Sequence, residues 1–168
     1  MKLKQNEIKA IKELLAAAEN RSNRTLEDLH KRLSADNHVE LYVDGAADLH
    51  SKTAGIGGVF YQYGNEIDTF SEYLDDATNN EAEYSALIRG LHMAKEMNIA
   101  SINIFSDSQL IVNQVNGEFR VKHEKMIPLH AEATELLDDF DSWSLEYIPR
   151  DNNTVADKLC KAGMMLGR

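Results

Sequence analysis

GIGGVFYQYGNEIDTFSEYL, residues 55–74, is predicted to form two β-strands joined by a tight turn at Gly64-Asn65. A turn this short forces the two strands to pair antiparallel. The preceding stretch VELYVDG (39–45) alternates and is rich in strand-forming residues, so we expect a strand that ends at its Asp-Gly pair. A loop over 46–54 then leads into the hairpin. The main domain therefore begins with three consecutive antiparallel strands.

Helices alternate with strands in the rest of the chain. DATNNEAEYSALIRGLHMAKEMN (76–98) has apolar residues at helical spacing, and Thr78 can cap this helix with Glu81 three residues on. Beyond it we expect a strand at 100–107, a short helix at 108–117, a longer helix at about 124–139, a strand at 142–149 and a helix at 153–166. Because helical crossovers join parallel strands, the expected fold class is α/β, with a five-stranded mixed sheet flanked by helices on both faces.

Residues 1–38 are predicted to form a separate helical hairpin. Apolar residues recur at helical spacing over 4–19, and a second short helix opens at Thr25 with leucines along one face. Residues 34–38 have the composition of a linker. The sequence therefore predicts a helical extension followed by a main domain at 39–168. Three roles stay open for the extension: packing on the domain, pairing with a second chain, or recruiting a partner protein.

The composition predicts a protein with an ordinary hydrophobic core. Of its 168 residues, 43% are hydrophobic, which is enough for a folded domain rather than a disordered chain. No apolar run reaches the roughly 18 residues of a membrane span, and the charged N-terminus does not resemble a signal peptide. The single cysteine, Cys160, excludes an internal disulfide and a cysteine-rich zinc site. We therefore expect a cytoplasmic protein without membrane contact.

The net charge of −10 is distributed unevenly along the chain. Residues 1–38 hold eight Lys/Arg and six Asp/Glu, giving +2, whereas residues 39–168 hold ten and 22, giving −12. Such a balance argues against nucleic-acid binding through a uniformly basic surface. Binding of nucleic acid would depend on a local site, on metal ions, or on both.

Four acidic residues lie where predicted elements begin or end. Asp44 in YVDG and Asp107 in FSDSQ follow strands, whereas Glu83 in TNNEAEY and Asp157 in RDNNTVAD lie near helix starts. Each alone has an ordinary explanation, such as a turn residue or a favourable charge at a helix N-terminus. Together in one cleft, their mutual repulsion would require divalent cations, and carboxylates favour Mg²⁺ or Mn²⁺. The sequence lacks the His-x-x-x-His and Cys-x-x-Cys patterns that favour zinc.

The motifs YVDG, TNNEAEYSAL, FSDSQLIVNQVNGEF and PRDNNTVADKL resemble, in order and spacing, those of type 1 ribonuclease H. The resemblance covers about residues 39–166 and is closest to the compact prokaryotic branch without a basic protrusion helix. It implies a ribonuclease H-like fold and an Asp-Glu-Asp-Asp set that binds two Mg²⁺ ions, with Mn²⁺ able to substitute. The family cleaves the RNA strand of RNA–DNA hybrids and leaves 5′-phosphate and 3′-hydroxyl ends. On this chain, the metal-binding and catalytic set falls on Asp44, Glu83, Asp107 and Asp157.

The resemblance also implies substrate contacts. Asn79 and Asn80 match a motif that reads the minor groove and 2′-hydroxyls, which suits amides because both groups donate and accept hydrogen bonds. Gln109 matches a substrate-contacting position, and Gly45 would let the backbone approach the substrate beside the first acid. Arg150 could bind a phosphate. The alternatives are a solvated loop charge for Arg150 and ordinary helix-start polarity for the asparagines.

Two features depart from many relatives. Residues 149–153, PRDNN, form a short loop without the His that a longer loop often carries. Arg120, Lys122, His123 and Lys125 form the only compact basic cluster of the main domain, and they could contact the DNA strand or simply be solvated. The alternative function is therefore a weakly active or inactive nucleic-acid-binding module, with the N-terminal hairpin recruiting a partner. Resolvases, integrases and 3′-exonucleases also use clustered acids, but the TNN and SDSQ contexts favour the hybrid nuclease.

Overall fold

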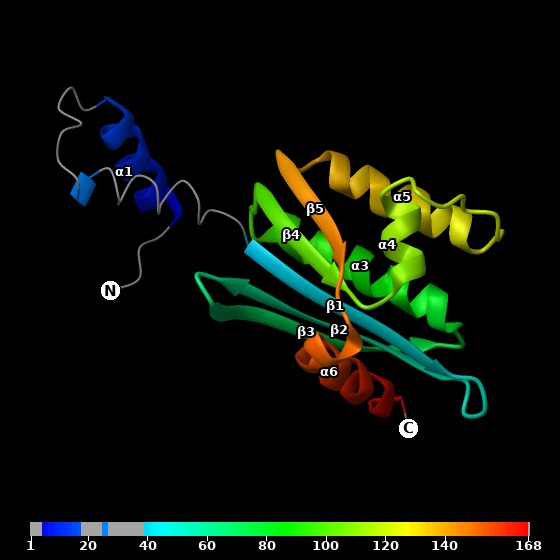
Figure 1. Cartoon of the computed structure of the whole chain (residues 1–168). Helices are drawn as coiled ribbons and strands as arrows, with labels where there is room; N and C mark the ends of the chain where they lie inside the picture. The colour runs from blue at the N-terminus through cyan, green and yellow to red at the C-terminus, as the bar shows by residue number, and fades with distance from the viewer. Residues whose placement is uncertain (1–4, 18–24, 27–38, 168) are drawn as a thin grey trace. The chain divides into compact units, whose positions relative to one another are not determined.

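The structure, a computed structural model, describes residues 5–17, 25–26 and 39–167. The chain divides into two compact units, Met1–His38 and Val39–Arg168, and each is described by itself (Figure 1). Separate roles for the two units stay a prediction. No helix within the described ranges is long and apolar enough to cross a lipid bilayer.

The N-terminal unit contains helix α1, Gln5–Ala17, where the sequence predicts its first helix. Ile11 and Leu15 are half-buried, whereas Leu14 is exposed. Thr25 and Leu26 are helical, but the remainder of the predicted second helix and the predicted linker lie outside the described residues.

The second unit is built on the predicted five-stranded mixed sheet, which is confirmed. The strands are arranged in the order β3-β2-β1-β4-β5. The first three strands pair antiparallel, whereas β1 and β4, and then β4 and β5, pair parallel. The strands are β1 (Val39–Asp48), β2 (Thr53–Gln62), β3 (Asn65–Asp75), β4 (Ser101–Ser106) and β5 (Ser142–Tyr147). The central position of β1 gives it one antiparallel and one parallel neighbour.

The turn between β2 and β3 lies one residue earlier than predicted. Gln62 pairs with Asn65, so Tyr63 and Gly64 form the turn instead of Gly64 and Asn65. Both turn residues have positive φ, 54° and 72°, as a two-residue turn that matches the twist of the strands requires. Gly64 is a typical turn residue and was predicted correctly. Tyr63 was not predicted in the turn because tyrosine rarely has a positive φ.

Strand β1 is longer than the sequence predicted. It continues past Gly45 to Asp48, and its pairing with β2 runs as far as Asp48 opposite Thr53. The predicted loop over 46–54 is therefore reduced to residues 49–52. Alanine and aspartate have weak strand preference, so the backbone pairing with β2 outweighs the local preference at these positions.

Helices cover both faces of the sheet, as predicted. Figure 1 shows α6 on the opposite side of the sheet from α3, α4 and α5. α3 packs on β1 and β2 and is itself covered by α5, whereas α6 packs on β1, β2 and β3. The helices are α3 (Asn79–Glu96), α4 (Gln109–Val115), α5 (Met126–Asp138) and α6 (Thr154–Met165), with a 3-10 turn at Arg150–Asn152 before α6.

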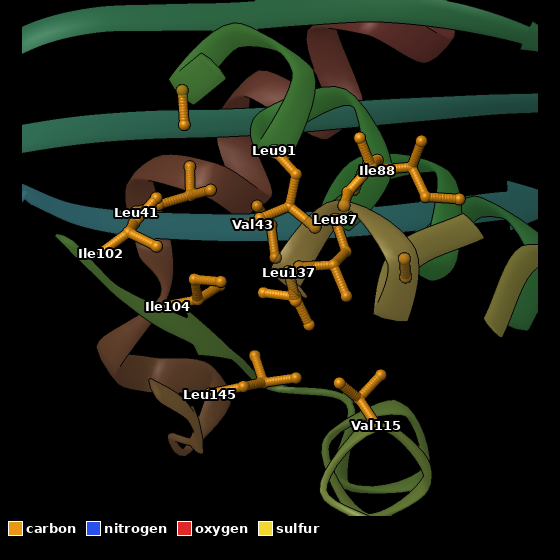
Figure 2. Packing of buried hydrophobic residues seen from close by; sticks show 14 of the residues in the cluster. Leu41, Val43, Leu87, Ile88, Leu91, Ile102, Ile104, Val115, Leu137 and Leu145 are labelled. Carbon is orange, nitrogen blue, oxygen red and sulfur yellow. The ribbon is translucent and has the colours of Figure 1, made fainter. Parts of the chain in front are cut away.

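The main hydrophobic core lies between the sheet and the helices α3 and α5. Aliphatic side chains from β1, β4 and β5 meet leucines of these two helices and are almost completely buried (Figure 2). The strands contribute Leu41, Val43, Ile102, Ile104 and Leu145, and the helices contribute Leu87, Leu91 and Leu137. Burial of each such side chain stabilises the fold by about 1.5–3 kcal/mol.

Glycines bring α6 into backbone contact with the sheet on the opposite face. A methyl group at Gly57 would overlap the backbone of Cys160, and one at Gly55 would overlap the backbone of Cys160 and Met164. Gly57 is also the cross-strand partner of Asp44. The close approach of α6 therefore occurs at the same level of the sheet as the first predicted acid.

We predict that Gly57→Ala lowers the free energy of unfolding by about 2–3 kcal/mol, because the new methyl group overlaps backbone that cannot rotate away. Gly58→Ala is a comparison variant on the same strand, since the nearest atoms to its methyl group belong to the Phe70 side chain and not to the backbone of α6. Urea denaturation of both variants and the parent measures the difference. An unchanged stability in Gly57→Ala would contradict the packing described for α6.

Candidate active site

Three of the four predicted acids meet at one end of the parallel strand pair. The β1–β4 ladder ends with Val43 opposite Ser106, so Asp44 and Asp107 are the next residue on each chain segment. Glu83 comes from α3. One carboxylate oxygen from each of Asp44, Glu83 and Asp107 lies within 4.8 Å of the other two. This geometry allows all three groups to contact a single cation.

Gly45 lets Glu83 reach the other two acids. A methyl group at Gly45 would overlap the backbone of Ala82 and Glu83, so only glycine allows α3 to lie this close to β1. The Gly45 backbone also provides a hydrogen bond that opposes the rise in the pKa of Asp44 and Glu83. In the structure, Gly45 is buried under α3 and therefore has a packing role, whereas substrate approach at Gly45 stays a prediction.

Glu81 forms the predicted capping box at the start of α3. The Thr78 hydroxyl accepts a hydrogen bond from the Glu81 backbone N–H at 3.3 Å, and the Glu81 carboxylate accepts from the Thr78 N–H at 2.8 Å. Glu81 also forms an ion pair with Lys125 at 3.5 Å. Glu81 and Glu83 therefore separate as predicted, with the first capping the helix and the second joining the acidic cluster.

Each of the three clustered acids has one buried oxygen without a hydrogen-bond donor. These oxygens are Asp44 Oδ2, Glu83 Oε2 and Asp107 Oδ2. A buried carboxylate oxygen without a partner costs about 1–3 kcal/mol or more, so three together are unfavourable unless a cation binds them. Divalent cations with oxygen ligands match this donor set.

Burial and mutual repulsion raise the pKa of the clustered acids. Burial, followed by the charges of Asp44 and Asp107, raises the pKa of Glu83 to about 9. Burial, followed by the charges of Asp107 and Asp157, raises the pKa of Asp44 to about 7. Burial also raises the pKa of Asp107. Near neutral pH, the metal-free cluster therefore retains protons that a divalent cation would displace.

Asp157 lies beside this cluster, in the first turn of α6, but is not one of the three converging groups. Its carboxylate accepts hydrogen bonds from Arg150 Nη2 at 3.2 Å and from Lys161 Nζ at 2.6 Å. Burial alone would raise the pKa of Asp157, but the hydrogen bonds and charges of Lys161 and Arg150 outweigh burial and lower it. The predicted set of four is thus three clustered acids and a fourth paired with two bases.

The predicted substrate-binding residues differ in exposure and in hydrogen bonding. Asn79 Oδ1 accepts a hydrogen bond from the Ala47 backbone N–H at 2.6 Å, which leaves its NH₂ group for other contacts. Asn80 and Gln109 are exposed near the starts of α3 and α4. The Arg150 side chain is 68% exposed while it contacts Asp157, and its charge also opposes the rise in the pKa of Asp44 and Asp107. Their roles toward substrate stay predictions.

The predicted basic cluster is exposed on the segment between α4 and α5. Arg120, Lys122, His123 and Lys125 all lie at the surface, and residues 116–125 contain no helix. Arg120 also lines a shallow groove of about 460 Å³ beside the exposed ring of Phe119. The segment therefore combines positive charge with exposed apolar surface, although its contact with nucleic acid stays a prediction.

Comparison with known proteins identifies the family. The family model described as "Reverse transcriptase-like" matches residues 42–163. The Ribonuclease HI of Halobacterium salinarum is 33% identical over 127 residues, which cover 75% of this chain and 64% of that protein. The crystal structure of RNase H1 from Halobacterium salinarum superposes with a TM-score of 0.73 at 32% identity, covering 76% of this chain and 98% of that one. The chain belongs to the type 1 ribonuclease H family.

Two further ribonuclease H relatives extend the comparison. The bifunctional protein Rv2228c of Mycobacterium tuberculosis is 32% identical over 128 residues, which cover 75% of this chain but only 35% of that protein. LC11-RNase H1, in a structure with an RNA/DNA hybrid, has a TM-score of 0.72 at 30% identity and covers 77% of this chain and 98% of that one. The chain thus spans about a third of the length of the bifunctional relative and somewhat less than two thirds of the archaeal one.

Two residues of this ribonuclease H family member were missed by the sequence analysis. Lys161 lies four residues after Asp157 on α6, and this i, i+4 spacing is a recognisable signal for an ion pair. Asn153 is 1% exposed, and its Nδ2 donates a hydrogen bond to the Val43 carbonyl at 2.9 Å. An asparagine just before a helix ordinarily indicates an N-cap, so its link to a strand 110 residues earlier has no local signal.

We predict that, without metal, the protein loses stability as the pH rises from 7 to 9. The folded state holds the Glu83 proton up to about pH 9, whereas the unfolded chain releases it near 4.5. Each pH unit in this window therefore lowers the free energy of unfolding by at most about 1.4 kcal/mol. Asp44, with a pKa of about 7, contributes mainly below this range.

Urea denaturation in EDTA at pH 7 and pH 9 measures this loss in three proteins. Glu83→Gln should lose much less stability than the parent over this pH range. Glu81→Gln is the matched control and should keep the parent's pH dependence, because the capping hydrogen bonds lower the pKa of Glu81 and keep it ionised. The same loss in Glu83→Gln and the parent would contradict the raised pKa of Glu83.

Proposed function

We propose that this chain is an endonuclease that hydrolyses the RNA strand of RNA–DNA hybrids, leaving 5′-phosphate and 3′-hydroxyl ends. The observation that carries the proposal is the cluster of three buried carboxylate oxygens without donors, in a member of the ribonuclease H family. The solved complex of the relative LC11-RNase H1 with an RNA/DNA hybrid supports the choice of substrate. The three carboxylate oxygens without donors favour a metal-dependent enzyme over a module that only binds nucleic acid.

Asp44, Glu83 and Asp107 would hold the divalent metal, because only these three carboxylates converge among the described residues. We propose Mg²⁺ as the physiological ion, two ions per site, and Mn²⁺ as a substitute. When bound, such ions activate a water molecule for attack on the phosphodiester and stabilise the departing 3′-oxygen. Asp157 would join the ligand set when Arg150 and Lys161 release its carboxylate.

Arg150 would exchange one anionic partner for another as substrate binds. Its guanidinium group is mostly exposed and contacts Asp157 at 3.2 Å, so it can turn toward a phosphate without breaking a buried contact. A guanidinium group pairs well with phosphate oxygens because it presents several N–H donors in one plane. Movement of this charge would also release the Asp157 carboxylate for metal.

Asn80 and Gln109 would recognise the ribose of the RNA strand. Both are exposed near the start of a helix, and both are close in sequence to a clustered acid. Asn80 lies three residues before Glu83, and Gln109 lies two residues after Asp107. An amide can donate to and accept from a 2′-hydroxyl, which a DNA strand lacks. Asn79 would contribute through its NH₂ group, because its oxygen already accepts from Ala47.

The main domain would carry the whole reaction, because the cluster and the proposed substrate residues all lie within 39–168. A role for residues 1–38 in self-association or in recruiting a partner stays a prediction, as does a cytoplasmic location.

A cleavage assay on three labelled duplexes tests the proposal. The protein should cut the RNA strand of a hybrid in Mg²⁺ or Mn²⁺, leave double-stranded RNA and double-stranded DNA intact, and lose activity in EDTA. Hybrid binding in a gel shift without any cleavage in either metal would instead support the inactive binding module. Metal-independent cleavage would exclude the proposed role of the acidic cluster.

We predict that Glu83→Gln and Asp107→Asn each lower the rate of hybrid cleavage by at least about 100-fold, because each removes a charged ligand with little change of shape. Glu81→Gln should keep near-parent activity, since Gln can replace Glu in a capping box. Single-turnover rates in Mg²⁺ measure the effect, and circular dichroism checks folding. Near-parent cleavage by Glu83→Gln or Asp107→Asn would overturn the assignment of that residue.

We predict that Asn80→Ala and Gln109→Ala raise KM for the hybrid by up to about 10-fold with a smaller change in kcat, as expected for the loss of one hydrogen bond. A hybrid with a single 2′-deoxy substitution next to the scissile phosphate provides the control substrate. The deoxy substitution should raise KM more for the parent than for the variants. An equal rise in KM for parent and variants would show that these side chains do not contact the ribose.

A further inference from the structure

Asn153 links the start of α6 to the strand that carries the first acid. Its side chain is buried, and its Nδ2 donates to the carbonyl of Val43, the residue immediately before Asp44, at 2.9 Å. The two residues are 110 positions apart in the sequence. A buried side-chain hydrogen bond of this kind fixes a long-range spacing that no local interaction determines.

The backbone of Asn153 also fixes the fourth acid. Its carbonyl accepts the hydrogen bond of the Asp157 backbone N–H at 3.0 Å, which is the first turn of α6. One residue thus contacts both the strand of Asp44 and the helix of Asp157.

Asn153 does not perform the ordinary function of an asparagine at a helix start. An N-cap side chain accepts a hydrogen bond from a backbone N–H in the first turn. Asn153 occupies the N-cap position of α6 but makes no such bond, and its buried Oδ1 has no hydrogen-bond partner. The side chain therefore donates a hydrogen bond to the sheet and does not cap its own helix.

We infer that Asn153 is a positioning residue that holds Asp44 and Asp157 at the spacing needed to bind metal. This inference rests on the proposed metal-dependent function. A group that orients metal ligands from behind typically changes metal affinity or activity by about 10–100-fold when it is removed.

Substitution by alanine and by serine separates positioning from capping. Serine is as good an N-cap as asparagine, but its hydroxyl is too short to replace the amide link to Val43. If Asn153 only helped α6 to begin, Asn153→Ser would match the parent while Asn153→Ala would not. If it positions the acids, both variants should lose about 10–100-fold in Mg²⁺ affinity.

Ser71→Ala provides a matched control for general loosening of α6. The Ser71 hydroxyl donates to the Leu159 carbonyl at 2.6 Å, so it also ties α6 to the sheet, but through the edge strand β3. Removing this bond should leave Mg²⁺ affinity within about 2-fold of the parent. The comparison therefore distinguishes the link to Val43 from any link that holds the helix.

The experiment measures the melting temperature of the full chain against Mg²⁺ concentration, together with kcat and KM on a hybrid. Both Asn153 variants should need about 10–100-fold more Mg²⁺ for half of the thermal shift and should lose kcat with little change in KM. Asn153→Ser keeps a cap, so it serves if Asn153→Ala does not fold.

Three outcomes would overturn the inference. Parent-like Mg²⁺ affinity in Asn153→Ser would show that Asn153 acts only as a helix cap. An equal loss of affinity in Ser71→Ala would show that any loosening of α6 has the same effect. A parent protein that neither binds Mg²⁺ nor cleaves would overturn the proposed function and this inference together, whereas the first two outcomes leave the proposed function standing.

Discussion

The repulsion among three clustered carboxylates, each with one buried oxygen, is the constraint on which the rest of this domain depends. Asp44, Glu83 and Asp107 place oxygens within 4.8 Å of one another without donors for their innermost atoms. Such an arrangement opposes folding unless protons or cations compensate it. The surrounding protein must therefore supply enough packing to hold the three groups together. The aliphatic core between the sheet and α3, a short distance along the same strands, provides that packing.

Strand β1 is where these demands meet. It is central in the sheet, it carries Asp44, and it contacts α3 on one face and α6 on the other. Gly45 admits α3, and Gly57, directly opposite Asp44 on β2, admits α6. Two helices from distant parts of the sequence thus reach the same level of two neighbouring strands. The acids therefore come together partly because glycine, which has no side chain, allows the two helices to approach the sheet.

The sequence predicted features that depend on local spacing and failed where distant pairing decides. The antiparallel pairing of the first three strands, the helix positions and the separation of Glu81 from Glu83 all follow from motifs of a few residues. The turn at Tyr63 and the extension of β1 to Asp48 follow instead from pairing with β2. The hydrogen bond from Asn153 to Val43 spans 110 residues, so no local pattern predicts it. The ion pair of Asp157 with Lys161 has an i, i+4 spacing from which it could have been predicted.

The glycine contacts of α6 also limit which atoms around Asp157 can move. Because the helix backbone lies directly against β2 at Gly55 and Gly57, α6 cannot slide without separating the sheet from its cover. Adjustment at Asp157 is therefore confined to rotations of its own side chain and of Arg150 and Lys161. Exposed side chains rotate on the order of picoseconds to nanoseconds, whereas shifts of whole helices take microseconds or longer. Exchange of the partners of Asp157 therefore requires only the rotation of side chains and not the movement of α6.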